Sequence, residues 1–517
     1  MKNQTLLRRF QNWPQKNAEV TKRLEFSAFF AFFCGYTGVL KVPLLFAMFS
    51  FCAAGLGLAQ QSDPVQDNLQ TVPHFKPRLV VLTDLSNEPD DEESFVRLLV
   101  YSDQFDIEGL VATTSNWLKR NPREDLIRRD LAAYAQVRTY LVKHSAAFPP
   151  VENLLAVTRT GQTHYGMAAV GPGKSSAGSQ RIIEALDRAD DRPVWVAIWG
   201  GPNTLAQALW DVRASRSMDE VNKFVGKLRV YAISDQDDSG PWLRREFPNL
   251  FYIVSPSNPT SYLEYYRATW SGISSGRGDQ AAPGYHFDMV DNPWLETNII
   301  KNHGPLGALY PRLQYLMEGD TPSYLGLIDR GLGWEISPAN GGWGGRYALY
   351  QPAGEPRPIW TDNVNNRDRV EVEKDRFETS SQATIWRWRE HFQNDFAARM
   401  DWCVADDFKQ ANHNPHPVLN GNRSTDVVLI SAKAGSTVKL SATGTDAGDD
   451  GQNVKLTWWI YREAGTLDEM RLSQTNGAET EALLPNKSGK VHVILQAEDD
   501  GTPHLFAYRR IIITATP

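Results

Sequence analysis

Short apolar runs alternate with amphipathic segments between residues 78 and 235 of this 517-residue chain. The apolar runs predict buried strands at 78–84, 105–115, 193–201 and 228–235. The amphipathic segments predict helices at 92–101, 123–144, 179–188 and 204–212. This order predicts an α/β domain with a mostly parallel sheet and helices on both faces. Ligands of such a domain bind at the carboxyl ends of the strands.

A different pattern begins near residue 412, where Thr, Ser, Gly and Val become frequent. Short alternating runs such as STVKLSATGTD and KVHVILQAEDDG are separated there by turn residues. Such runs are typical of an immunoglobulin-like β-sandwich, whose core we expect to include Trp458 or Trp459. We therefore assign residues 77–411 to the α/β domain and 412–517 to the β-sandwich. Residues 60–76 are polar and aperiodic, which indicates a linker.

Residues 1–59 form a leader with two apolar runs, at 26–40 and 44–59. Neither run reaches the roughly 20 residues that span a bilayer. The second run follows Lys41 and ends in Gly-Leu-Ala, which are the parts of a signal peptide cleaved after Ala59. We expect a secreted or periplasmic bacterial protein with no stable membrane anchor after cleavage. The alternative is an uncleaved anchor.

The charge of the chain excludes one class of partner. Residues 1–59 hold seven of the 54 Lys and Arg but two of the 61 Asp and Glu, so the remainder has a net charge near −12. An acidic body of this kind repels a phosphate backbone, and we expect no nucleic-acid partner.

Six oxygen-bearing side chains follow the first predicted strand in the eight residues DLSNEPDD, from Asp84 to Asp91. Carboxylates this close repel one another unless they share a cation, and Ca2+ is the hard divalent ion we expect. The alternative is a solvated turn in which Asp90 or Asp91 caps the next helix. The sequence contains no signature of zinc proteases, Ser hydrolases, P-loop NTPases or dinucleotide-binding enzymes.

Five segments in order resemble the nucleoside hydrolase superfamily, and more closely its secreted bacterial members known as cellulose-binding. They are TDLSNEPDD, WGGPNTLAQAL, EGDTPSYLGLI, NGGWGGRY and WRWREHFQNDFAARMDW. The resemblance covers most of residues 77–517. It implies a nucleoside-hydrolase-like fold, a bound Ca2+ and a carbohydrate or nucleoside-like ligand, with cellulose among the candidates. Members of the superfamily are often oligomers, so the resemblance also allows an oligomer here.

The resemblance assigns roles to single residues. It implies catalytic roles for Asp84, Asp90 and Asp91, with Asp90 binding a furanose hydroxyl. It implies that the metal is held by Asp84, Asp91, the backbone carbonyl of Gly200, and Asp320. Two positions depart from the family. Ser86 replaces the second acidic residue, which is thought to activate the attacking water, and Gly319 replaces a His that often acts as the leaving-group acid.

Other residues at strand ends are candidates for contacting the substrate. They are Asn87, Asn116, Trp117, His164, Asp237 and Trp343. Asn116 resembles the Asn that faces the sugar in the family. A second acidic loop, SDQDDSGPW, contains Asp237 and Asp238, and both are candidates for the missing acid, as are His164 and His303. Trp343 lies in NGGWGG, where we expect the glycines to leave the ring exposed for stacking on a sugar.

Together these features predict a secreted glycosidase that hydrolyses N- or O-glycosyl bonds, with furanosyl bonds the leading class, through a metal-activated water. The alternative is a non-catalytic protein that binds cellulose or another polysaccharide on the same scaffold. Retention of Asp84, Asp90, Asp91 and Asp320 favours the enzyme. The departures at Ser86 and Gly319 favour the binding protein.

Overall fold

The computed structural model describes residues 70–86, 88–255, 273, 286–314, 317–362 and 365–517. The predicted leader at 1–59 and the candidate residue Asn87 lie outside these ranges, as do residues 60–69 of the predicted linker. Within the described ranges, none of the helices combines the length and the apolar character that crossing a bilayer requires.

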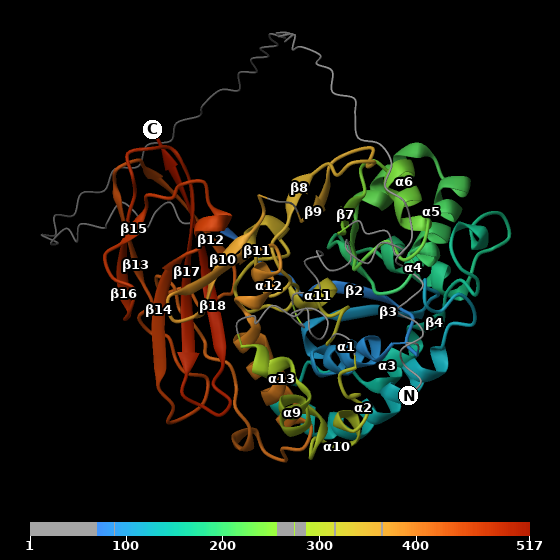
Figure 1. Ribbon diagram of the computed structural model, residues 1–517, viewed down its shortest axis with the longest axis horizontal. Coiled ribbons are helices and arrows are strands. Elements are labelled where there is room, and N and C mark those ends of the chain that lie inside the picture. Colours follow the sequence, from blue (N-terminus) through green and yellow to red (C-terminus); the bar gives the residue numbers. More distant parts are fainter. Residues whose placement is uncertain (1–69, 87, 256–272, 274–285, 315–316, 363–364) are drawn as a thin grey trace, which may run out of the picture. The chain divides into compact units, whose positions relative to one another are not determined.

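The central sheet has the strand order β4-β3-β2-β5-β6-β7-β9-β8 (Figure 1). Its strands are β2 (Arg78–Thr83), β3 (Asp106–Ala112), β4 (Thr158–Thr160), β5 (Val194–Ile198), β6 (Leu228–Ala232), β7 (Phe251–Ile253), β8 (Ala348–Tyr350) and β9 (Ile359–Thr361). All neighbours pair in parallel except β8 and β9, which are antiparallel. The predicted mostly parallel sheet is therefore confirmed.

Helices connect and cover these strands. They are α1 (Pro89–Val100), α2 (Glu124–His144), α3 (Val151–Ala156), α4 (Ala177–Asp187), α5 (Asn203–Ser215), α6 (Met218–Gly226), α7 (Ser239–Glu246), α9 (Asn292–Leu295), α10 (Gly304–Gly307), α11 (Pro322–Leu325), α12 (Ala383–Trp386) and α13 (Arg389–Trp402). Shorter 3-10 turns lie at Ser102–Gln104, Met167–Ala169, Phe287–Val290, Pro338–Asn340, Phe408–Gln410 and Arg462–Ala464, and a π-helical turn lies at Glu296–Ile300.

Alternate residues of β2 enter two different hydrophobic cores. Leu79 and Val81 pack in a cluster that includes side chains of α1 and α2, whereas Val80 and Leu82 pack with α4, α5 and α6. Successive side chains of a strand point to opposite faces of the sheet. Helices therefore cover both faces, as predicted, and β2 is buried on both sides.

The C-terminal strands form two sheets around a third core. One sheet has the order β1-β12-β18-β17-β14 and the other β13-β16-β15. Their bounds are β1 (Gln70–Val72), β12 (Val427–Lys433), β13 (Thr437–Ser441), β14 (Val454–Ile460), β15 (Arg471–Leu472), β16 (Glu479–Leu483), β17 (Gly489–Asp499) and β18 (Phe506–Thr516). Trp458 is fully buried in the core that both sheets share, which confirms the predicted β-sandwich.

Two short elements were not predicted from the sequence. Strand β1 lies inside the predicted linker and pairs antiparallel with β12. It is a three-residue edge strand with mainly exposed side chains, so it carries no hydrophobic period by which a sequence reveals a strand. A hairpin of β10 (Asp368–Glu373) and β11 (Arg376–Ser380) precedes α12.

Candidate functional site

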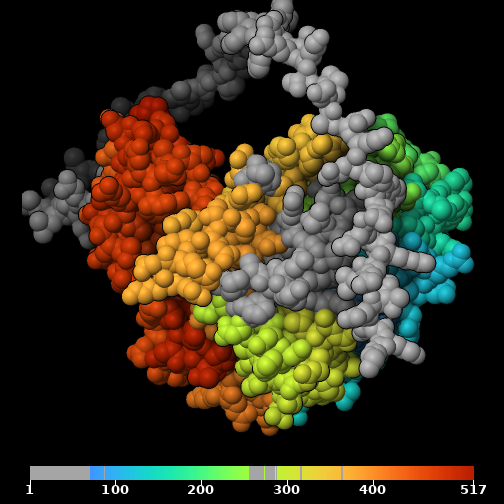
Figure 2. Space-filling model, in the orientation of Figure 1, coloured from blue at the N-terminus to red at the C-terminus, as the bar shows by residue number. Residues whose placement is uncertain are grey.

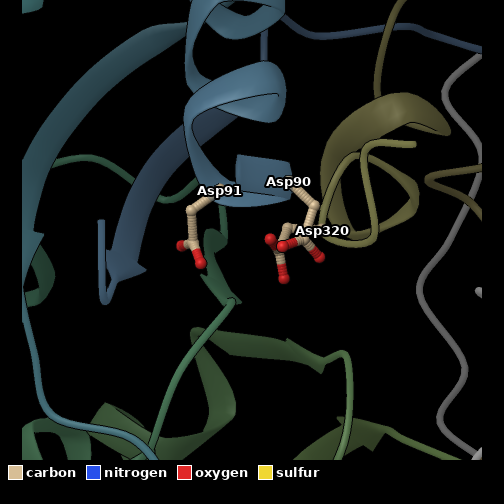
Figure 3. Close-up of side chains that lie close together, drawn as sticks. All are labelled: Asp90, Asp91 and Asp320. Atoms are coloured by element: carbon tan, nitrogen blue, oxygen red, sulfur yellow. The ribbon is translucent and has the colours of Figure 1, made fainter. Parts of the chain in front are cut away.

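Three carboxylates meet beyond the carboxyl end of β2. Asp90 and Asp91 occupy the first turn of α1, and Asp320 lies in the loop before α11. One oxygen from each lies within 4.8 Å of the others. Figure 3 shows the side chains pointing into one space from these two elements. The site is thus where ligands of a parallel sheet are expected, and we call these residues the acidic cluster.

Burial sets the electrostatics of the acidic cluster. Asp91 and Asp320 are buried, and desolvation together with repulsion from neighbouring acids raises the pKa of both well above the usual value. Asp84 lies outside the cluster but close enough to raise the pKa of both residues, and burial raises its own pKa to about 6. Each charge is therefore unfavourable until a proton or a cation compensates it.

Unpaired oxygens make these residues a chemical fit for a hard divalent cation. Oδ1 of Asp84 and Oδ2 of Asp320 are buried and have no hydrogen-bond partner among the described residues. Buried polar atoms in folded proteins almost always have a partner, so such atoms at a shared site indicate a missing ligand. Carboxylate oxygens are the ligands that Ca2+ prefers.

Strand ends hold the acids in place. The Thr83 hydroxyl donates to Oδ1 of Asp91 at 2.8 Å, and the Ser115 hydroxyl after β3 donates to Asp84. A side chain on Gly200, after β5, would lie 2.5 Å from Oδ1 of Asp84. The absence of a side chain at this glycine lets the end of β5 approach the acid closely. Gly200 thus lies beside Asp84, as the predicted role of its carbonyl requires.

Ser86 occupies a strained position next to these acids. Its side chain is exposed, and its backbone φ of 130° lies in a region that non-glycine residues rarely adopt. Backbone strain of this kind persists where the surrounding structure imposes it, often at functional sites. The hydroxyl carries no negative charge, unlike the acid that the family resemblance leads us to expect at this position.

Asp237 forms a second buried acid near the same strand ends. Its Oδ1 accepts a hydrogen bond from the Ser239 backbone N–H at 2.7 Å and another from the Ser239 hydroxyl. Its Oδ2 is buried without a partner among the described residues and lies 2.4 Å from where a side chain on Gly201 would start. Burial raises the pKa of Asp237 to about 7. Asp84 and Asp237 therefore contact successive glycines of one turn.

The other predicted substrate residues differ in exposure. In the loop that follows β3, Asn116 is half-buried and Trp117 has 45% of its surface exposed. His164 is exposed, and its backbone carbonyl accepts a hydrogen bond from the Asn203 side chain at 2.8 Å. The same Asn203 amide donates to the Thr114 hydroxyl, so these loops are joined near the strand ends.

The predicted exposure of Trp343 is wrong, because only 2% of its surface is accessible. The glycines around it produce the opposite effect to the one expected. A side chain on Gly344 would lie 2.8 Å from the Gly326 backbone N, and one on Gly341 would overlap Tyr461. Without side chains, the loop packs closely against neighbouring backbone and buries the indole against Phe392.

The sequence analysis missed the residues that fix Asp320. The Arg97 guanidinium of α1 donates to both carboxylate oxygens of Glu318, at 2.5 and 3.0 Å, and both side chains are fully buried. The Glu318 backbone N–H donates to the Glu93 carboxylate at 2.7 Å. Glu93 and Arg97 are four residues apart on α1, a spacing that puts them on one helix face. This spacing was the one feature of the sequence that could have indicated these residues.

We predict that Arg97→Met lowers the free energy of unfolding by about 3–5 kcal/mol, because it leaves the buried Glu318 carboxylate without its partner. The double variant Arg97→Met/Glu318→Leu should lose much less, because neither charge remains. Urea unfolding measures both values. Arg123→Met, which breaks an exposed ion pair, is the control and should change stability far less. Equal losses in the single and double variants would contradict the prediction.

A second prediction concerns Ca2+ itself. At a concentration 100 times its Kd, a ligand that binds the folded state alone adds about 2.7 kcal/mol to the free energy of unfolding. We expect thermal unfolding to show this gain in wild type and its loss in Asp320→Asn. In EDTA, Asp320→Asn should be at least as stable as wild type, because one member of a repelling set is gone.

Asp219→Asn, on the exposed surface of α6, is the matched control and should keep the full response to Ca2+. A gain in Asp320→Asn equal to that of wild type would mean that Ca2+ binds elsewhere.

Comparison with known proteins agrees with this architecture. Residues 78–347 match the family model "Cellulose-binding Sde182, nucleoside hydrolase-like domain", and residues 437–515 match "Cellulose-binding protein Sde0182, C-terminal domain". No curated protein matches the chain.

Among solved structures, a nucleoside hydrolase-related hypothetical protein from Saccharophagus degradans, described as associated with carbohydrate metabolism, is 35% identical. The match covers 86% of this chain and 100% of that chain, with a TM-score of 0.73. The effector protein XOO4466 is 10% identical over 64% of this chain and 95% of its own, with a TM-score of 0.34. The type III effector XopQ, complexed with adenosine diphosphate ribose, is 12% identical over 51% and 70%, with a TM-score of 0.25.

The two effector likenesses carry no argument at these TM-scores. The first family model spans more than half of the chain, and the Saccharophagus degradans protein is matched over its whole length. These matches confirm the family resemblance that the five sequence segments indicated. This chain therefore belongs to the family described as cellulose-binding Sde182, with a nucleoside hydrolase-like domain and the associated C-terminal domain.

Proposed function

We propose that this protein is an exported, Ca2+-dependent hydrolase of glycosyl bonds, with furanosides as the leading substrate class. The observation that carries the proposal is the acidic cluster, three carboxylates gathered near Asp84, whose buried Oδ1 has no hydrogen-bond partner among the described residues. A surface that only binds sugars has little use for buried carboxylates that repel one another. The family description supports a carbohydrate as the ligand.

Asp84, Asp91 and Asp320, with the Gly200 carbonyl, are the groups that would hold the ion. When bound, Ca2+ would offset their charge and polarise a water molecule. Cleavage of a furanosyl bond passes through an oxocarbenium-like state, which a nearby negative charge stabilises. Asp90 is half-buried and has an oxygen within 4.8 Å of oxygens of Asp91 and Asp320, where it can accept hydrogen bonds from sugar hydroxyls.

Asp237 is the residue we propose as the leaving-group acid. The position before Asp320 is Gly319, so a proton donor must come from another loop. The unpaired Oδ2 of Asp237 lies against Gly201, one residue from the glycine that contacts Asp84. Ser239 occupies the other oxygen, which leaves Oδ2 as the atom that can carry and deliver a proton.

Hydrolysis assays test the two roles separately. With p-nitrophenyl furanosides and inosine as substrates, Asp91→Asn should lower kcat/KM for all of them by at least about 100-fold, as should EDTA. Asp237→Asn should lower kcat for inosine by about 10²–10⁴-fold. Its effect on p-nitrophenyl substrates should be less than about tenfold, because p-nitrophenolate leaves without protonation.

Asp219→Asn again serves as control and should retain wild-type rates. Equal losses for both kinds of substrate in Asp237→Asn would remove this residue from the role of acid. If EDTA and Asp91→Asn leave hydrolysis unchanged, the site proposal is wrong.

The second candidate function is a non-catalytic carbohydrate-binding protein. Two observations favour it, the exposed Ser86 and Gly319, at positions where the family resemblance leads us to expect an acid and a His. Binding of insoluble cellulose without turnover of any furanoside or nucleoside, in the presence of Ca2+, would establish this reading over the enzyme.

A further inference from the structure

A groove of about 520 Å³ borders the β10–β11 hairpin and shares no residue with the acidic cluster. Residues 369–374 of the hairpin segment line one side, Arg387, Trp388 and His391 line another, and Trp459 and Gln496 of the C-terminal sheet complete it. Figure 2 shows the orange segment that includes the hairpin adjoining the red C-terminal strands. Its volume is within the range of about 300–1,000 Å³ that is usual for ligand sites.

The two Trp residues of β14 face opposite ways. Trp458 points into the sandwich core, so its neighbour Trp459 lies on the outer face of the same sheet. The Trp459 ring contacts the rings of Trp388 and Tyr461, with centroids 5.7 and 5.5 Å away, and the Arg387 guanidinium lies 5.4 Å from its centroid. Trp459 is thus half-buried and held on several sides, yet it still lines the groove.

Polar groups suited to sugar hydroxyls adjoin this ring. In the β14–β17 ladder Trp459 is opposite Ile494 and Thr457 is opposite Gln496, which puts the Gln496 amide on the Trp459 face, one ladder step away. Nε1 of Trp388 is buried without a hydrogen-bond partner among the described residues. An amide and an indole N–H next to an aromatic face are the groups that recognise a hydroxylated ring.

The charges of the groove indicate a neutral ligand. Arg369 and Lys374 flank Glu371 and Glu373 along the hairpin wall, so charges of both signs are present in equal number there. Arg387 is already paired with Asp368 at 2.7 Å and with Glu463 at 3.6 Å. No field of one sign is left to attract a polyanion, so affinity here must come from stacking and hydrogen bonds.

We propose that this groove binds a segment of a neutral β-linked glucan chain, with Trp459 as the stacking platform and Gln496 as a hydroxyl partner. The inference rests on the carbohydrate ligand of the proposed function, but it places glycan binding apart from the acidic cluster. We assign to this groove the binding of a chain and no part in its cleavage.

Calorimetric titration of the full chain with cellohexaose tests the proposal. Trp459→Ala should weaken binding by at least about tenfold, and Gln496→Ala should weaken it less. Tyr350→Ala, which removes an exposed ring that lines neither the groove nor the acidic cluster, should keep wild-type affinity. Thermal unfolding checks that each variant is folded. If Trp459→Ala is not folded, Trp459→Leu keeps the volume but removes the flat ring, and it should also weaken binding.

Two outcomes would overturn the inference: wild type that does not bind cellohexaose, and a folded Trp459 variant with unchanged affinity. Failure of the enzyme proposal alone would give a different set of results. In that case Asp91→Asn and wild type would both bind cellohexaose with equal affinity, and neither would hydrolyse a furanoside. If Trp459→Ala loses binding but hydrolyses small furanosides at the wild-type rate, both proposals stand and the two sites are independent.

Discussion

The buried ion pair between Arg97 and Glu318 is the contact on which the geometry of the acidic cluster depends. It joins α1, which carries Asp90 and Asp91, to the loop that carries Asp320 two residues later. A charge that is buried away from water is costly, and several neighbouring groups compensate the charge of Arg97. The Arg97 guanidinium also donates to the Phe392 carbonyl at 3.1 Å and lies 3.9 Å from the Phe396 ring centroid. Helix α13 thus completes the support.

This support is what allows carboxylates to stay together against their repulsion. Burial raises the pKa of Glu93 as well, and its carboxyl group accepts a hydrogen bond from the Glu318 backbone N–H. The Trp199 indole at the end of β5 donates to the Ser323 hydroxyl, which donates to the Asp320 carbonyl. Asp320 is therefore fixed from α1 and from the sheet. A preorganised set of this kind costs stability without a cation and regains it when one binds.

How much of such a site can be predicted from a sequence depends on how far apart its residues lie along the chain. Asp84, Asp90 and Asp91 follow one strand within eight residues, and their meeting could be predicted from the order of strand and helix alone. Asp320 is more than 220 residues further on, and only the family resemblance connected it with them. Arg97 and Glu318 carried no local signal of pairing, because a buried ion pair looks like any two charged residues in a sequence.

The wrong prediction for Trp343 and the missed strand β1 also arise from contacts between parts of the chain that are distant in sequence. The glycines around Trp343 were interpreted as a sign of exposure, but glycine also permits the closest packing of backbone, and the fold uses it for that. Strand β1 escaped notice because its stability comes from the edge of β12, which lies more than 350 residues away. The strands and helices of the parallel sheet were predicted well, because burial on both faces leaves a continuous apolar run that needs no knowledge of the partner.

The groove adds a reason for joining the two domains in one chain. Its walls come from both, since Trp388 precedes α13 whereas Trp459 and Gln496 belong to the sandwich sheet. A glycan held there stays tethered to the protein that carries the acidic cluster, so a second, weaker contact becomes intramolecular and gains from a raised effective concentration. The hydrophobic core that the two domains share also has a role in this arrangement. Tyr461, Phe506 and Tyr508 pack with α/β residues in one hydrophobic cluster, so the sandwich is joined to the domain that carries the acidic cluster.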